Sequence, residues 1–439
     1  MTDGSSTTGE TSLQAGEVLS VTGGNPLSGT VRVPGAKNSA LKLIAASLLT
    51  DAVVELHDMP AISDVPVMAR LVRSVGATAE FAGSTLRLQA AGEVNWQPDR
   101  DLMAAIRAST AMLGALVGRT RKARLVSPGG DKIGKRAIDL HLMGLEEMGA
   151  HIEHGEGFID VIAPDLHGAR ITLEYASVGA TENLVMAATL ADGVTVIDNA
   201  AREPEIQDLC RMLVAMGATI DGIGTSTVTI HGTDRLEGVT WTVVPDRIEA
   251  GTWMVAAAVT HGDVRVDNVR PGHHEMLLRV LERAGVGVTT ERNAVVVTAD
   301  ELHATRIITL PYPGLPTDMM PQLLVLLTQA IGASQCTENV FESRYSFVGE
   351  LQRMGADITV EGHHAVVRGP SRLHGAHIDA LDIRAGAAGA IAGLVADGTT
   401  IVHDIHHLDR GYAGFAERMQ ALGGNVRRLP AAEIGSPNG

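Results

Sequence analysis

Basic and acidic side chains beside glycine-rich turns mark the places where this chain could bind and transform an anionic ligand. Residues 34–39 read Pro-Gly-Ala-Lys-Asn-Ser and set Lys37 and Asn38 at the start of a predicted helix. The free N–H groups and partial positive charge of a helix N-terminus, together with a lysine, would bind a phosphate. A capped helix with a solvated lysine is the alternative, and this segment alone favours that simpler interpretation.

A glycine-rich loop carries a second group of charges. Residues 127–136 read Ser-Pro-Gly-Gly-Asp-Lys-Ile-Gly-Lys-Arg and include Asp131 and Arg136. Loops of this kind often move over a ligand, but a polar surface turn would have the same composition. Residues 177–181 open another helix with Ser-Val-Gly-Ala-Thr, whose small side chains leave the backbone amides open to an anion. A simple serine cap is the alternative there.

Five arginines lie in similar small-residue or turn settings: Arg107, Arg247, Arg344, Arg384 and Arg410. A single arginine is usually a solvated surface residue, but this recurrence favours a convergent cationic cluster. Asp318 stands in an apolar setting, where burial would raise its pKa and suit the carboxylate to proton abstraction. For that segment alone, an aspartate that caps the following helix is the simpler interpretation.

The elements that must position these residues form a repeat. Glycines recur at intervals of 68 to 73 residues in phrases such as Val-Gly-Ala and Met-Gly-Ala: Gly76, Gly149, Gly217, Gly285, Gly355 and Gly423. A period of this length indicates one folding unit copied along the chain. We expect each of these glycines to stop a helix, as glycine commonly does after the last helical turn.

The third copy shows the order of elements within one unit. Residues 177–189 suit a buried helix, 194–198 a strand, 205–216 an amphipathic helix, and 218–220 with 228–231 a hairpin. The sequence therefore predicts an α/β protein built from six helix–strand–helix–hairpin units.

The two ends of the chain complement each other. The sixth unit breaks off near Pro430, whereas residues 19–29 match the hairpin segments of other units. We expect the N-terminal hairpin to complete the sixth unit, so that the chain crosses near Gly35 and returns near Pro245. Two domains of three units would then flank a ligand-binding hinge. The predicted parts are a flexible lead of residues 1–17, a domain of residues 36–243, a domain of residues 18–35 plus 244–430, and a flexible tail of residues 431–439.

Composition narrows the class of protein. With 439 residues the chain exceeds one hydrophobic core, and its formal net charge of −16 argues against a nucleic-acid binder. An anionic ligand would need a local cationic cluster to overcome this charge. No apolar run reaches the length of a membrane span, and the histidines lack the spacing of a metal site. Cys210 and Cys336 lie in apolar contexts, which favours buried thiols in a reduced cytosolic protein.

Together, these motifs resemble one family over about residues 18–430: the UDP-N-acetylglucosamine 1-carboxyvinyltransferases, which are enolpyruvyl transferases. The matching segments are residues 34–38, 107–109, 128–136, 177–181, 199–205, 245–247, 316–318, 340–344 and 409–412. The resemblance implies an inverted α/β barrel-like fold of two domains with three units each. It implies transfer of enolpyruvate from phosphoenolpyruvate to the 3-OH of UDP-N-acetylglucosamine with release of phosphate, the first committed step of peptidoglycan precursor synthesis, in the cytoplasm. No cofactor, metal, nucleic acid or membrane partner is implied.

The resemblance also implies roles for individual residues. Phosphoenolpyruvate would be held by Lys37, Asn38, Arg136, Arg384 and Arg410. The UDP-sugar would be held by Arg107, Ala137, Ile138, Asp139, Leu140, Ser177, Val178, Gly179, Asp318, Val340 and Arg344, with Asn38 beside them. Asp318 would take the proton from the 3-OH, Asp131 would protonate the methylene carbon, and Asp382 would be a second acid near the reaction centre.

The sequence departs from the family pattern at three positions. Asp131 stands where many members have a cysteine. A carboxylic acid can still donate a proton, but thiol-alkylating epoxides such as fosfomycin would lose their target. Ala137 replaces a proline and Tyr175 replaces a lysine near the expected nucleotide. A paralogue acting on another nucleotide or on shikimate 3-phosphate stays open, as does a non-catalytic scaffold, which would predict loss of the charged residues present here.

Overall fold

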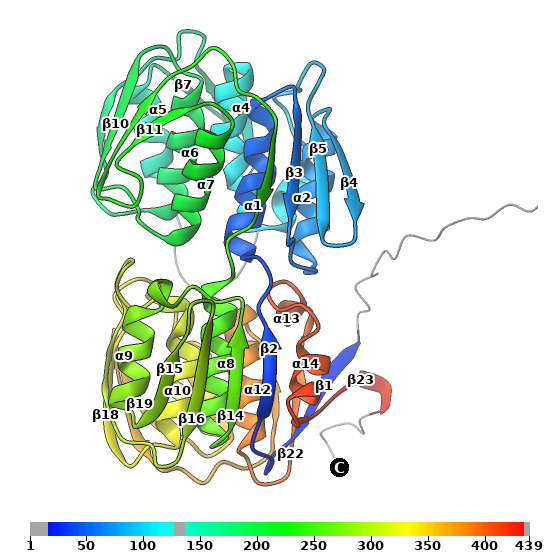
Figure 1. Cartoon of the computed structure of the whole chain (residues 1–439), viewed down its shortest axis with the longest axis vertical. Helices are drawn as coiled ribbons and strands as arrows, with labels where there is room; N and C mark the ends of the chain where they lie inside the picture. The colour runs from blue at the N-terminus through cyan, green and yellow to red at the C-terminus, as the bar shows by residue number, and fades with distance from the viewer. Residues whose placement is uncertain (1–15, 127–136, 434–439) are drawn as a thin grey trace, which may run out of the picture.

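Figure 1 shows a computed structural model of the chain, which describes residues 16–126 and 137–433. These residues form two α/β bodies, one above the other in the figure. None of the helices in this described part combines the length and hydropathy that a bilayer span requires.

The upper body contains the first three units. The first is α1 (Lys37–Ala46), η1 (Ser47–Leu49), β3 (Val53–His57), α2 (Asp64–Ser74), β4 (Thr78–Ala82) and β5 (Thr85–Gln89). The second is α3 (Arg100–Ala105), η2 (Arg107–Ala111), α4 (Met112–Thr120), β6 (Lys122–Val126), α5 (Asp139–Glu147), β7 (His151–Gly155) and β8 (Phe158–Ile162). The third is α6 (Val178–Thr189), β10 (Val194–Asp198), α7 (Pro204–Ala215), β11 (Thr219–Asp221) and β12 (Thr227–His231).

The lower body contains the other three units. The fourth is α8 (Arg247–Val259), β14 (Asp263–Asp267), η3 (Pro271–His273), α9 (Glu275–Arg283), β15 (Val286–Thr290) and β16 (Ala294–Ala299). The fifth is η4 (Thr317–Met319), α10 (Met320–Thr328), β18 (Gly332–Thr337), α11 (Val348–Arg353), β19 (Asp357–Glu361) and β20 (His364–Gly369). The sixth is α12 (Ile383–Leu394), β22 (Thr399–His403), α13 (His406–Asp409), α14 (Phe415–Ala421), β23 (Asn425–Pro430) and, from the other end of the chain, β1 (Glu17–Thr22).

The predicted order of helix, strand, helix and hairpin is confirmed in these units. The six repeated glycines follow the second helix of each unit with positive φ angles between 88° and 106°. In the first unit, the Gly76 and Ala77 amides bond back to the carbonyls of Arg73 and Val72. These bonds satisfy carbonyls that a helix end leaves unpaired, and only glycine adopts this conformation without strain.

The N-terminal segment behaves partly as predicted. Strand β1 pairs antiparallel with both β22 and β23 and so completes the sixth unit. The next strand, β2 (Ser28–Arg32), pairs parallel with β14 of the fourth unit, so the expected hairpin is wrong. Glu17 and the short turn η5 (Ala431–Glu433) belong to the fold, in contrast to the expected lead and tail. The rest of the lead and tail, residues 1–15 and 434–439, lies outside the described residues.

Short parallel strands link most of the units to a neighbouring unit. Strand β9 (Arg170–Thr172) joins β10, β17 (Arg306–Ile308) joins β18, and β21 (His377–Asp379) joins β22. Strand β13 (Val239–Thr242) leaves the third unit and joins β3 of the first, as β2 leaves the sixth and joins β14 of the fourth. The three lower units therefore close into a ring. In the upper body, the sheet of the second unit consists of β6, β8 and β7, and no described strand of the first unit joins it.

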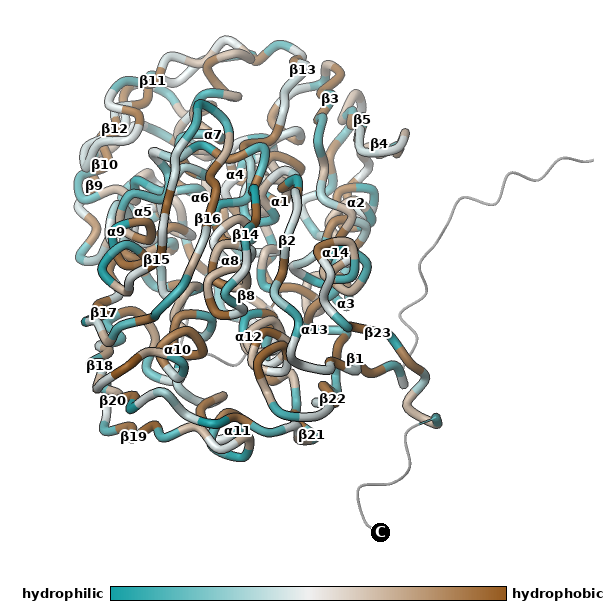
Figure 2. The backbone as a smooth tube through the Cα atoms, turned by 60° about the horizontal axis from the view of Figure 1, so that its bottom comes forward, coloured by the Kyte–Doolittle hydropathy of each residue, from teal (hydrophilic) through white to brown (hydrophobic). Residues whose placement is uncertain are grey.

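The first helix of each unit lies inside its body, whereas second helices such as α9 and α14 are buried on one side only. Every residue of α12 is buried, and so is every residue of α8 after the first. This burial explains the alanine- and glycine-rich sequences of the two helices. In Figure 2, α10 is largely apolar, whereas β18 and β20 beside it mix apolar and polar residues. The described apolar core residues form two clusters, one within residues 40–243 and one within residues 19–33 and 248–426.

The chain passes between the bodies twice, at adjacent places. Gly35 forms an antiparallel bridge with Pro245, and the Ala36 amide bonds to the Val244 carbonyl at 2.7 Å. A Cβ on Gly35 would lie 2.3 Å from the Asp58 carbonyl oxygen, so this close approach requires glycine. We propose residues 36–243, and 18–35 plus 244–430, as the two domains because the apolar clusters separate there.

Candidate active site

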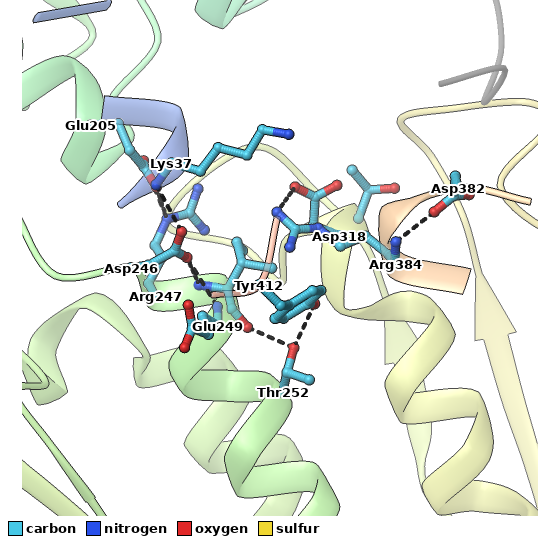
Figure 3. A network of polar contacts seen from close by, with 12 residues as sticks. Lys37, Glu205, Asp246, Arg247, Glu249, Thr252, Asp318, Asp382, Arg384 and Tyr412 are labelled. Atoms are coloured by element: carbon cyan, nitrogen blue, oxygen red, sulfur yellow. Dashed lines mark hydrogen bonds and ion pairs between the residues drawn. The ribbon is translucent and has the colours of Figure 1, made fainter. Parts of the chain in front are cut away.

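Several helix starts meet where the two domains face each other, and they carry charged residues expected from the sequence (Figure 3). Lys37 is the first residue of α1, Arg247 the first of α8, and Arg384 the second of α12, while Asp318 lies in η4. Helix N-termini add partial positive charge to such a region. The arrangement favours a bound anion between the domains.

Lys37 is held by carboxylates from both domains. Its backbone amide donates to Oδ2 of Asp246 at 3.0 Å, and its Nζ lies 2.8 Å from Oδ2 of Asp64. The lysine is buried, with 7% of its surface exposed. Burial lowers the pKa of Lys37, while the Asp64 carboxylate opposes this and the Arg410 and Arg384 guanidinium groups lower it further.

Arg410 reaches the same carboxylate from the opposite domain. Its Nε lies 3.0 Å from Oδ1 of Asp64, and its Nη2 lies 3.4 Å from Oδ2. Arg410 follows α13 near the end of the chain, whereas Asp64 begins α2. Lys37 and Arg410 are thus brought together, as the predicted phosphoenolpyruvate site requires.

Asp318 lies between two arginines. Nη2 of Arg344 is 2.9 Å from its Oδ1, and Nη2 of Arg384 is 3.5 Å from its Oδ2. About a quarter of the Asp318 side chain, 26%, is exposed, whereas both arginines are almost wholly buried. A fixed, partly accessible carboxylate can therefore meet a ligand while its orientation is set from behind.

A chain of hydrogen bonds orients Arg344. Its Nε donates to the Thr317 hydroxyl at 3.0 Å, and that hydroxyl donates to Oε2 of Glu338 at 3.0 Å. Oε1 of Glu338 accepts the backbone amides of Val340 and Phe341. The residues predicted to meet the sugar, Val340 and Arg344, therefore belong to the network that positions Asp318.

Arg384 is positioned by Asp382 and Tyr412. The Asp382 carboxylate caps α12 by accepting the amides of Arg384 and Ala385 at 2.7 and 2.9 Å. The Arg384 guanidinium lies 5.4 Å from the centre of the Tyr412 ring, whose hydroxyl contacts Thr252 at 3.0 Å. Among the described residues, Nη1 of this buried arginine has no hydrogen-bond partner. An anionic ligand would supply one.

Arg247 joins the two domains. Its Nε donates to Oε1 of Glu205, at the start of α7, at 3.0 Å, and both side chains are buried. Burial raises the pKa of Glu205, but Arg247 and Lys42 lower it by more than burial raises it, so the pKa lies below its ordinary value. Arg247 therefore forms an interdomain ion pair with Glu205, and its charge also acts on Asp318.

The upper domain brings together the segments expected to hold a nucleotide. Ser177 caps α6 by accepting the Ala180 amide at 3.2 Å. A Cβ on Gly179 would lie 2.7 Å from Nε2 of His141, so the starts of α5 and α6 touch here. Burial, and secondarily Arg107, lowers the pKa of His141 to about 4, while Asp139 opposes this. A neutral imidazole thus lies within a group of predicted ligand residues.

Comparisons with known proteins decide between related families. A family model described as EPSP synthase (3-phosphoshikimate 1-carboxyvinyltransferase) matches residues 21–419. UDP-N-acetylglucosamine 1-carboxyvinyltransferases of Corynebacterium jeikeium and Mycobacterium tuberculosis are each 48% identical over 410 residues, which cover 93% of this chain and 98% of each relative. The chain belongs to the UDP-N-acetylglucosamine 1-carboxyvinyltransferase family.

Solved structures of enolpyruvyl transferases have the same fold. The enolpyruvyl transferase NikO from Streptomyces tendae matches with a TM-score of 0.86 and 27% identity, covering 95% of this chain and 99% of that one. EPSP synthase from Acinetobacter baumannii matches with a TM-score of 0.75 and 20% identity, covering 94% and 100%. The two-domain α/β fold predicted from the repeat is therefore confirmed.

For this carboxyvinyltransferase family member, one prediction about Asp318 is wrong. Burial does raise the pKa of its carboxyl group. The combined effect of four cations is larger and opposite, so the pKa lies below its ordinary value; these cations are Arg384, Arg344, Arg247 and Lys37. The carboxylate is therefore ionised near neutral pH. Asp318 also caps no helix, because the N-cap of η4 is Pro316 and that of the following helix α10 is Met319.

The remaining predicted site residues either lie outside the described part of the chain or are exposed or partly buried. Asp131 and Arg136 lie outside the described residues, and Ala137 is the first residue after that gap. Ala137 and Asp139 are exposed, while Ile138, Leu140 and Val178 are partly buried. Asn38 is partly buried beside Lys37.

Sequence reasoning missed the acidic residues that hold the cations. Asp246 and Glu205 lie inside segments that carried the family resemblance. The sequence therefore marked their positions but did not indicate that they hold cations. Asp64 and Glu338 stood in no such prediction. Asp64, Asp246 and Glu205 each lie at a helix start and bond to a residue from another unit, and local sequence gives no signal of such a partner. Glu338 bonds to Thr317 within its own unit.

Proposed function

We propose that the chain transfers the enolpyruvyl group of phosphoenolpyruvate to the 3-OH of UDP-N-acetylglucosamine and releases phosphate. The names of relatives 48% identical over nearly the whole chain support this activity. We place the reaction in the cytoplasm, as the first committed step of peptidoglycan precursor synthesis. The ligands in this proposal are small molecules, and the negative net charge of the chain gives no support for a nucleic-acid partner.

The meeting of cations from both domains carries the proposal. Lys37 from the upper domain and Arg384 and Arg410 from the lower domain surround a region that also contains Asp318. Phosphoenolpyruvate carries a phosphate and a carboxylate, and charge-assisted bonds from lysine and arginine suit both groups. We assign these three residues, with Asn38 and Arg136, to phosphoenolpyruvate.

Asp318 is proposed as the base for the acceptor hydroxyl. Its carboxylate takes the 3-OH proton as the oxygen bonds to C2 of phosphoenolpyruvate, while Asp131 gives a proton to the methylene carbon. The product of this addition is a tetrahedral adduct that still carries phosphate. Loss of one methyl proton and cleavage of the C2–O bond to phosphate then give the enolpyruvyl ether and free phosphate. Fixed cations around the adduct stabilise its negative charge without reorganisation.

The low pKa of Asp318 has a cost for this role, since a weak base abstracts a hydroxyl proton poorly at rest. The 3-OH becomes more acidic only as its oxygen bonds to the electron-poor C2. Arg344 and Arg384, bound to the two oxygens of Asp318, keep the carboxylate ionised and aimed until that moment. We assign Asp382 to the same centre through its hold on Arg384.

The nucleotide is assigned to the upper-domain helix starts and to residues across the cleft. The upper-domain set is Arg107, Ala137, Ile138, Asp139, Leu140, Ser177, Val178 and Gly179. The lower-domain set is Asp318, Val340 and Arg344. Tyr175, which replaces the lysine expected from the family, is 44% exposed beside this region, and Ala137 replaces the expected proline. These observations keep a second candidate, transfer to another nucleotide.

An acceptor panel tests the assignment. Purified protein with phosphoenolpyruvate would be mixed separately with UDP-N-acetylglucosamine, UMP or shikimate 3-phosphate, and inorganic phosphate release would be measured. We expect release with UDP-N-acetylglucosamine and only background release with the other two. Faster release with UMP or shikimate 3-phosphate would overturn the proposed acceptor. Release with none of the three would overturn the activity.

A further inference from the structure

Asp64 lies at the boundary between the two domains, and the family resemblance assigned it no role. It is the first residue of α2, and 3% of its surface is exposed. Both of its carboxylate oxygens are bound to cations: Nζ of Lys37 at 2.8 Å, and Nε and Nη2 of Arg410 at 3.0 and 3.4 Å. A buried carboxylate with two cationic partners is an element of the site rather than a solvated surface residue.

The two cations come from different domains. Lys37 belongs to α1 of the upper domain, and Arg410 lies 346 residues after Asp64 in the chain, in the lower domain. The backbone supports the same contact, because the Ser63 amide donates to the Asp409 carbonyl at 2.9 Å. The segment before Arg410 is therefore docked on the start of α2.

Arg428 holds that docked segment from within the lower domain. Its Nη1 and Nη2 donate to the two oxygens of Asp409 at 2.8 and 2.7 Å. Arg428 lies in β23, which pairs with β1, so the peptide that carries Arg410 is tied to a sheet. The position of Arg410 is thus set by the lower domain, and Asp64 meets it from the upper domain.

We propose that Asp64 is a positioning residue that holds Lys37 and Arg410 together across the domain boundary for phosphoenolpyruvate. This inference rests on the proposed function, in which both cations bind that substrate. The Lys37 ammonium has three N–H donors, so its bond to Asp64 leaves donors for the substrate. Without the Asp64 charge, the buried Lys37 and the partly buried Arg410 would face each other and repel.

The ionisation of Lys37 gives the inference a second consequence. The groups that act on its charge are Asp64 of α2, Arg410 after α13, Arg384 of α12 and, across the cleft, Asp318 of η4. Of these, Asp64 raises the pKa of Lys37, whereas Arg410 and Arg384 lower it. Neutralising Asp64 therefore lowers the pKa of Lys37 further, and the lysine loses its proton at a lower pH.

The test compares Asp64→Asn with Asp64→Glu in the full-length protein. For Asp64→Asn we expect the KM for phosphoenolpyruvate to rise at least about tenfold, because a buried charge pair loses one partner. The high-pH limb of kcat/KM for phosphoenolpyruvate moves to lower pH, and the KM for UDP-N-acetylglucosamine changes little. Asp64→Glu keeps the charge and restores part of the loss. A merely structural role would not shift the pH limb.

Glu291→Gln is the matched control. It also removes a carboxylate that binds one arginine through both oxygens, with Arg265 at 2.7 and 2.8 Å, but on the exposed face of the lower domain. We expect it to leave both KM values and the pH limb unchanged.

Two results would overturn the inference. If Asp64 competed with the substrate for the cations, Asp64→Asn would lower the KM for phosphoenolpyruvate. If Asp64 were a bystander, the KM and the pH limb would match those of the wild type. Should Asp64→Asn not fold, as judged by thermal melting, Asp64→Ala takes its place, and a wild-type KM and pH limb in that variant would overturn the inference.

Failure of the proposed function would be visible separately. Wild-type protein would then release no phosphate with UDP-N-acetylglucosamine. The inference would still be tested by the rise in melting temperature that phosphoenolpyruvate alone gives to the wild type. We expect Asp64→Asn to lose that rise, and an equal rise in both proteins would contradict the role of Asp64.

Discussion

The Asp246 carboxylate accepts a hydrogen bond from the backbone amide of Lys37, with 3.0 Å between Oδ2 and the nitrogen. Its Oδ1 accepts the amides of Ile248 and Glu249 at 2.8 and 2.9 Å and so caps α8. One carboxylate thereby joins the first helices of the two domains (Figure 3). These bonds hold the start of α1 against the start of α8.

Asp246→Ala should therefore weaken both the fold and the site. Loss of a buried cap with three accepted bonds is expected to reduce the free energy of unfolding by about 2 kcal/mol. Because the start of α1 loses its tether, the KM for phosphoenolpyruvate should also rise. Urea denaturation and steady-state kinetics measure the two effects. Asp99→Ala, which removes the cap of α3, is the control and should lower stability without changing that KM.

Arg344→Gln should shift the pH dependence of activity. Arg344 is one of the cations that hold the pKa of Asp318 below its ordinary value. A group with a depressed pKa is ionised at lower pH, and removing a cation raises that pKa. The acid limb of kcat/KM for UDP-N-acetylglucosamine should therefore move to higher pH. The same linkage predicts that Asp318 stabilises the folded wild type above its ordinary pKa and that this contribution is lost on acidification.

The control for Arg344 is Arg353→Gln, which breaks an exposed pair with Glu350 at 3.2 Å. Its acid limb should coincide with that of the wild type. An acid limb unchanged in Arg344→Gln, with activity retained, would mean that Asp318 is not the group titrating in that limb.

The two cysteines should be chemically silent in the folded protein. Cys210 and Cys336 are each about 1% exposed, and burial raises the pKa of each thiol to about 12. Since the thiolate is the reactive form, a thiol reagent at pH 8 should label neither. Both should react after denaturation in guanidinium chloride. Rapid labelling of the native protein would contradict the buried placement.

Asp131→Cys should make the enzyme sensitive to fosfomycin. The wild type has a carboxylic acid at the position proposed to protonate the methylene carbon, and both cysteines are buried elsewhere. Wild-type turnover should survive incubation with excess fosfomycin, whereas Asp131→Cys should lose activity progressively and irreversibly. Asp131→Asn, which cannot donate that proton, should be nearly inactive. Irreversible loss in the wild type would remove the basis for this prediction.

Much of the architecture could be predicted because it depends on local chemistry. Gly76, Gly217 and their counterparts adopt positive φ at the end of a helix, and that requirement leaves glycine at a regular interval in the sequence. The pairing of β2 could not be predicted in the same way. A short strand such as β2 can pair with a strand of a neighbouring sheet as well as with its partner in a hairpin. The pairing with β14 depends on how the three lower units are arranged, and the local sequence does not specify that arrangement.

In the candidate active site, too, the features that depend on local sequence could be predicted and those that depend on distant residues could not. Lys37, Arg384 and Ser177 could be found from sequence because each stands at a helix start among small residues, which is a local pattern. The pKa of Asp318 could not, because the cations that lower it come from other units of the chain. Asp64 was missed for the same reason, since its partner Arg410 is 346 residues away.

The central claim is that cations from both domains act on one bound phosphoenolpyruvate. The most direct test is kcat/KM for phosphoenolpyruvate in Lys37→Met, which alters the upper domain, and in Arg384→Met, which alters the lower domain. We predict that each variant lowers kcat/KM by at least about a hundredfold, as expected for loss of a buried charge that binds an anion. Wild-type kcat/KM in either variant would contradict a site shared between the domains.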